Sequence, residues 1–190
     1  MRRTLLAVAA VLCAASALGH VTPNVELLRR GDFVKQSLPG AAHFFERQVM
    51  LSGPDGAAIL SATGWTPTEE EVKVYVGRDE KGGLVGSVVF LWMPSEHGPV
   101  GIGVAFDRQG MILRAAVTDV GTEPLAWVRP LLSSGGMDVF TGLPVDASPD
   151  PFRMAPSVRG AMSRYYAKVI VEGVKRARAL ERLVMRAGNP

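Results

Sequence analysis

Alternation of apolar and polar residues predicts a sheet in the middle of the chain. Val72-Lys73-Val74-Tyr75-Val76 alternates strictly, as a strand with one buried face does. The runs that follow are joined by short turns at Lys81-Gly82-Gly83 and Asp107-Arg108-Gln109-Gly110, which favours antiparallel pairing. We therefore expect an α+β domain with an antiparallel sheet of four to five strands. The predicted strands cover residues 43–51, 72–76, 84–92, 100–106 and 111–120.

Helical patterns flank these strands at both ends. Thr22-Pro23 is typical of an N-cap followed by the first helical residue, and Val25, Leu28 and Phe33 supply an apolar side. A long closing helix is predicted from Gly160 to Arg186, because small and apolar residues recur there at helical spacing. A short helix or a loop is expected at residues 54–62, and a short helix interrupted by Pro130 at residues 123–132.

The N-terminus has the composition of an export signal. Met1-Arg2-Arg3 precedes a short apolar run ending near Gly19, so residues 1–19 are predicted to be a signal peptide and residues 20–190 a single domain. Cleavage after Gly19 is the first expectation, after Ala17 the alternative, and retention as a membrane anchor a further alternative. The expected location is the periplasm or the outside of the cell.

Cleavage would change the chemistry that the chain can perform. It would remove Cys13, the only cysteine, so disulfides, thiolate metal sites and cysteine nucleophiles are not expected in the mature protein. It would also remove Arg2 and Arg3, which lowers the formal charge from +3 to +1. No membrane span is then expected, and this charge gives no reason to expect binding to nucleic acid.

Several short motifs, taken in order, resemble the FMN-binding domain family of the Rnf and sodium-pumping NADH:quinone complexes. The resemblance covers about residues 23–180. The motifs are Tyr75-Val76-Gly77-Arg78 with Gly83-x-Val85-Gly86, His97-Gly98-Pro99-Val100, Val104-x-Phe106-Asp107-x-x-Gly110, Thr122-Glu123-Pro124, and Ser157-Val158-Arg159-Gly160-Ala161-Met162-Ser163 at the start of the last helix.

The last of these motifs departs from the family at its key position. In the family a Thr hydroxyl carries FMN through a phosphoester, whereas this chain has Met162 at that position and Pro156 in place of the usual Asp. A thioether has no hydroxyl to esterify, and Ser163 lies one residue too far along, about 100° around the helix. The resemblance therefore implies noncovalent FMN, if any flavin is bound.

The resemblance places the phosphate at the start of the last helix and the flavin ring beside the Glu-Pro turn. Free N–H groups and a partial positive charge at a helix N-terminus favour a phosphate. Arg164 is a further candidate for the phosphate. The candidate cofactor-binding residues are Ser157, Arg159, Gly160, Ala161, Met162, Ser163, Glu123, Pro124 and Trp127.

Two functions remain open from the sequence. The first is an exported electron carrier with periplasmic or membrane-bound redox proteins as partners. The second is a cofactor-free interaction or assembly module that keeps the fold. No catalytic residue or metal site is predicted: His97 is expected to be structural, and the three histidines lack the spacing of metal ligands. Whether the protein is an enzyme is left open.

Overall fold

The computed structural model describes residues 23–67, 71–144, 147 and 160–186. They form an α+β fold around one six-stranded sheet in which every neighbouring pair of strands is antiparallel. The strand order is β1-β6-β5-β4-β3-β2, so the last five strands form a simple meander. The elements are β1 (Asn24–Glu26), α2 (Arg30–Ser37), β2 (His43–Met50), α3 (Pro54–Thr63), β3 (Glu71–Arg78), β4 (Leu84–Met93), β5 (Val100–Asp107), β6 (Ile112–Gly121), α4 (Leu125–Ser133), the short 3-10 helix η1 (Asp138–Phe140) and α6 (Ala161–Arg186).

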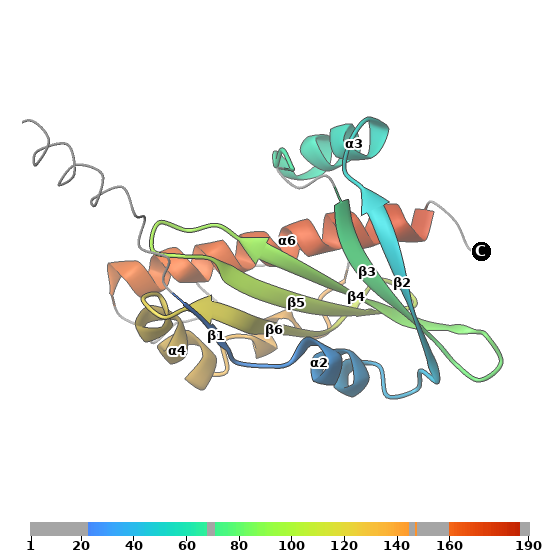
Figure 1. Cartoon of the computed structure of the whole chain (residues 1–190), viewed down its shortest axis with the longest axis horizontal. Coiled ribbons are helices and arrows are strands. Elements are labelled where there is room, and N and C mark those ends of the chain that lie inside the picture. Colours follow the sequence, from blue (N-terminus) through green and yellow to red (C-terminus); the bar gives the residue numbers. More distant parts are fainter. Residues whose placement is uncertain (1–22, 68–70, 145–146, 148–159, 187–190) are drawn as a thin grey trace, which may run out of the picture.

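The two faces of the sheet are covered very differently. The long helix α6 crosses one face and buries the main core with Tyr166, Ile170, Val174 and Leu180 (Figure 1). In the described part of the chain, the other face is covered only by the eight residues of α2, which bury a smaller cluster of Phe33, Val34 and Leu38 against Val88, Phe90 and Ala105. Part of this second face is therefore left to solvent, over strands β2, β3 and β4.

Close contact between α6 and the sheet depends on a glycine. A Cβ atom at Gly173 would lie only 2.3 Å from the Cδ1 atom of Ile102 and 2.9 Å from the Cγ atom of Met93. The helix backbone thus lies directly on the side chains of β4 and β5. This contact fixes the height of α6 above the sheet and the position of its N-terminal turns.

The predicted antiparallel strands and closing helix are confirmed, but the N-terminal prediction is wrong. The helix expected from Thr22-Pro23 is replaced by strand β1, and helix α2 begins only at Arg30. Val25 lies opposite Val120, and the Leu27 N–H donates to the carbonyl of Thr118. Pairing with β6 satisfies backbone groups that a free helix start would leave open, which explains why tertiary contacts override the capping pattern. The sheet consequently has six strands rather than four to five.

Candidate functional site

Helix α6 opens with an exposed and accessible first turn. Gly160 has φ of 120°, a conformation that favours glycine, and a Cβ atom added there would meet no atom of the described residues within 4 Å. The first helical bond runs from the Arg164 N–H to the Gly160 carbonyl. The N–H groups of Ala161, Met162 and Ser163 therefore precede the helical ladder, and the first turn carries no acidic residue. This end of α6 presents donors and a positive dipole to an anion.

The side chains in this first turn differ in exposure. Ala161 is exposed and Met162 is half-buried, whereas Ser163 is only 6% exposed. A buried hydroxyl is a poor acceptor for a bulky covalent group, so the geometry argues against a flavin ester at Ser163. Ser157 and Arg159, which the sequence also assigns to this site, lie outside the described residues.

The Glu-Pro turn lies at the end of β6, where the chain enters α4. Pro124 is buried at the N-cap position, and a Cβ atom on Gly121 would be 3.2 Å from its Cδ atom. Glu123 points instead to the loop between β4 and β5, where its Oε1 atom lies 2.8 Å from Nδ1 of His97. Both side chains are partly exposed, at 49% and 33%. The carboxylate thereby orients the imidazole and leaves Nε2 for another partner.

Aromatic rings join this pair to α6. The rings of His97 and Trp127 lie 5.0 Å apart, and Trp127 stacks on Tyr166 at 5.9 Å with an interplanar angle of 12°. Tyr165 meets Tyr166 edge-on at 5.1 Å. Offset or edge-on ring pairs of this kind add stability beyond the area that they bury. We call His97, Glu123, Trp127, Tyr165 and Tyr166 the His97 cluster.

Hydrogen bonds fix the cluster to the loop between β4 and β5. The hydroxyls of Ser95 and Tyr166 lie 3.0 Å apart, and the Glu96 N–H donates to the Tyr165 hydroxyl. Burial is the main cause of the raised pKa of Tyr166, which keeps this phenol protonated. Because Tyr165 follows Ala161 by four residues, the cluster begins about 6 Å along the helix axis from the open first turn.

The structure thus brings together some of the residues that the sequence assigns to one site. Glu123, Pro124 and Trp127 adjoin the second turn of α6, and Gly160 and Ala161 lie one turn before it. Trp127 already stacks on a protein ring, so at least one of its faces is occupied.

Sequence reasoning missed several members of the cluster. It expected His97 to be structural and named no partner for it, whereas its Nδ1 atom lies 2.8 Å from Oε1 of Glu123 in the structure. It also assigned no role to Ser95, Tyr165 or Tyr166. The adjacent tyrosines directly after the Gly-Ala turn were the available signal, since polar-tipped aromatic residues there lie at the proposed ligand end of the helix.

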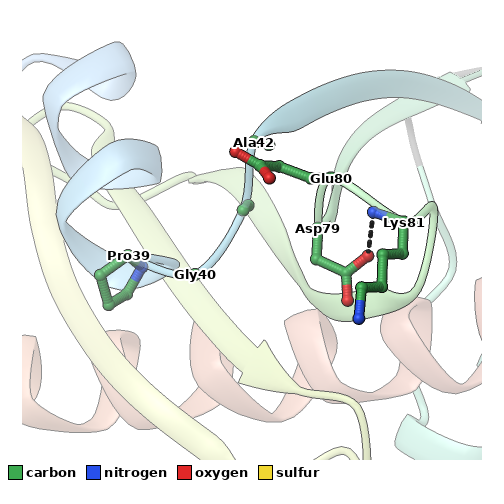
Figure 2. A pocket seen from close by; sticks show the side chains of 7 residues that line it. Pro39, Gly40, Ala42, Asp79, Glu80 and Lys81 are labelled. Atoms are coloured by element: carbon green, nitrogen blue, oxygen red, sulfur yellow. Dashed lines mark hydrogen bonds between the residues drawn. The ribbon is translucent and has the colours of Figure 1, made fainter.

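A separate hollow of about 530 Å³ lies at the far end of the sheet. Figure 2 shows Asp79, Glu80 and Lys81 of the β3–β4 turn facing Pro39, Gly40 and Ala42 of the α2–β2 connection. The Asp79 carboxylate accepts hydrogen bonds from the backbone N–H groups of Lys81 and Gly83, at 2.9 and 2.7 Å. The Asp79 carboxylate therefore closes the turn.

Comparisons with known proteins find no matching family, no matching curated protein and no matching solved structure. Within the described ranges, no helix has the length and apolar character needed to cross a membrane. No group of three or more His, Cys, Asp or Glu residues is placed to hold a metal ion in that same part of the chain.

Proposed function

We propose that this chain is an exported electron carrier that binds FMN noncovalently at the start of α6. The observation that carries the proposal is the position of the open Gly160–Ala161 turn one helical turn before the His97 cluster. An anion-binding helix end adjoins partly exposed aromatic and imidazole groups, which matches a ligand with a phosphate at one end and a ring at the other.

The phosphate end of the ligand fits the residues present. Backbone N–H groups of Ala161, Met162 and Ser163 would hold it, and the open space around Gly160 permits close approach. Arg164 is exposed in the same turn and would add a charge-assisted hydrogen bond. Met162 and the buried Ser163 both favour a noncovalent bond over an ester.

The ring end would adjoin His97 and Tyr165. Glu123 holds the imidazole through Nδ1, so Nε2 would serve as a positioned hydrogen-bond partner for a polar ring edge. Bound FMN would supply one- and two-electron transfer. The tyrosines and Trp127 would exclude water on the side of the sheet, because their rings already pack against one another. The acceptor and donor proteins would be periplasmic or membrane-bound redox partners.

The test is flavin binding by the mature protein purified from the periplasm. We expect a yellow protein that releases its flavin into the supernatant on acid precipitation. If the cofactor is lost during purification, the colourless protein should bind added FMN. Sequencing the N-terminus of the same sample tests export and the cleavage site. A protein that stays colourless and does not bind added FMN would contradict the proposal.

A charge variant tests the location of the site. Ala161→Asp adds a carboxylate in the first turn of α6. This negative charge interacts favourably with the helix dipole but repels a phosphate. We expect FMN affinity to fall about tenfold or more while the fold is retained. Ala57→Asp is the matched control, because Ala57 is equally exposed near the start of α3. Equal FMN affinity in the two variants would place the ligand elsewhere.

A cofactor-free interaction module remains the second candidate. It is favoured by the contacts of Trp127 within the protein. The Trp127 ring already stacks on Tyr166 and lies against His97, so it does not need a ligand as a packing partner. This alternative predicts a colourless protein that co-purifies with a partner. Recovery of a solitary monomer in native pull-downs would count against it.

A further inference from the structure

The face of the sheet opposite α6 holds an aromatic groove that is separate from the His97 cluster. Two adjoining hollows, of about 230 Å³ and about 180 Å³, share Arg30, Tyr75 and Phe90. The larger one is also lined by Gly31, Val34, Lys35 and Phe44. It lies between α2 and strands β2, β3 and β4, where Figure 1 shows the short helix leaving much of the sheet uncovered. We call this larger hollow the α2 groove.

Strand register explains why rings collect there. Tyr75 lies opposite Val88, and Phe44 lies opposite Gly77, so these side chains share the α2 face with Phe90. Tyr75 meets Phe90 edge-on at 5.8 Å. Gly103 lies opposite Phe90, and a Cβ atom there would be only 2.9 Å from that ring. The missing side chain at Gly103 leaves room for the Phe90 ring, which lines the floor of the groove.

The rim of the α2 groove is cationic. Among the described residues that line it, the charged ones are Arg30 and Lys35, and both are exposed. The Arg30 guanidinium lies 5.3 Å from the Phe90 ring centroid and 5.6 Å from that of Trp92. Among the described residues, no carboxylate pairs with Arg30 or Lys35. Two aromatic faces thus hold a cation in place while its N–H donors stay available.

Helix α2 begins beside this rim and presents a backbone donor to it. The first bond of its ladder runs from the Phe33 N–H to the Arg29 carbonyl, so the N–H group of Gly31 precedes the ladder. Gly31 itself lines the groove, and its Cβ position is open. An anion at this rim would therefore meet two cationic side chains and a free backbone N–H group, while the exposed Asp32 lies in the same first turn of α2.

The smaller hollow is less suited to an anion. It is lined by Glu71 as well as Lys73, and the Nζ atom of Lys73 lies 2.9 Å from Oε1 of Glu46. Its charges are therefore mixed and partly neutralised. Of the two hollows, the α2 groove is therefore the better site for an anion.

We propose that the α2 groove binds a small aromatic carboxylate. The rings of Phe44, Tyr75 and Phe90 form an apolar floor for one or two aromatic rings, and Arg30 with Lys35 receives the carboxylate. The volume is below that of a drug-sized site, which limits the ligand to this size. This site does not depend on the proposed flavin site, which lies on the opposite face of the sheet.

The test compares naphthoate with the neutral naphthalenemethanol by NMR titration of the mature protein labelled with nitrogen-15. We expect naphthoate to shift the backbone signals of Gly31, Val34 and Tyr75, and to bind about tenfold more tightly than the neutral probe. Failure of naphthoate to bind, equal affinity of the two probes, or shifts confined to other regions would overturn the proposal.

Variants at the exposed rim complete the test without disturbing the core. The double variant Arg30→Gln with Lys35→Gln should reduce naphthoate affinity about tenfold or more and leave that of naphthalenemethanol nearly unchanged. Arg108→Gln with Arg129→Gln removes two exposed cations from other parts of the surface and serves as the control. An equal loss in both double variants would mean that naphthoate responds to net charge only. A separate titration with FMN should shift the start of α6, so that failure of one site is distinguishable from failure of the other.

Discussion

Replacement of Glu181 by Gln should remove a large part of the pH dependence of folding. Glu181 lies on α6 and is only 3% exposed. Burial raises its pKa from the ordinary 4.5 to about 7; Arg182 and Arg178 oppose this shift, and Asp107 adds to it. The folded protein therefore prefers the neutral carboxyl. In the unfolded chain the same group ionises near its ordinary pKa.

The sign and size of the effect follow from linkage. The contribution of neutral Glu181 to the free energy of unfolding is fully present below pH 4.5. It is lost as the pH rises through the folded pKa of about 7. Across that interval the folded state binds more protons than the unfolded state, so the free energy of unfolding falls with pH. A pKa difference of this size corresponds to about 3 kcal/mol at neutral pH.

Urea unfolding between about pH 5 and about pH 8 tests this expectation. Glu181→Gln should be more stable than the wild type by about 3 kcal/mol at the upper end, and the difference should shrink toward the lower end. Glu172→Gln is the control, because Glu172 lies on the same helix but is exposed enough to pair with Arg176 at 3.2 Å. Parallel pH profiles for the wild type and Glu181→Gln would refute the reasoning.

Three further substitutions test packing and hydrogen bonding. Gly86→Ala should lower the free energy of unfolding by at least about 2 kcal/mol in urea titrations, because its Cβ atom would lie 2.2 Å from the backbone oxygen of Phe106. Gly31→Ala is the matched change in open space within α2, and should stabilise by up to about 1 kcal/mol; destabilisation there would contradict the assignment. Tyr166→Phe should cost about 1 kcal/mol through the lost bond to Ser95, and an unchanged thermal midpoint would show that this bond contributes nothing.

Local sequence patterns correctly predicted the strands that neighbour one another in the chain and the short turns that join them. The strict alternation at Val72–Val76 and the Asp107–Gly110 turn led to the correct antiparallel meander, because one buried face and a short turn suffice to specify it. The error at Val25 has a different origin. Its strand conformation depends on pairing with Val120, which lies 95 residues later in the chain. The residues around Val25 carry no local pattern that would reveal a pairing partner so distant in the sequence.

The candidate site shows the same division between local and distant contacts. The start of the last helix near Gly160 was predictable, since the stripe of small and apolar residues at helical spacing begins there. The pairing of His97 with Glu123 was not, because the nearer acid, Glu96, precedes it directly in the sequence. The meander places the β4–β5 loop beside the end of β6, which brings the Glu123 carboxylate within 2.8 Å of the imidazole. The sheet thus joins two loops into one cluster beside α6, while α2 covers only part of the opposite face among the described residues and leaves the aromatic groove exposed.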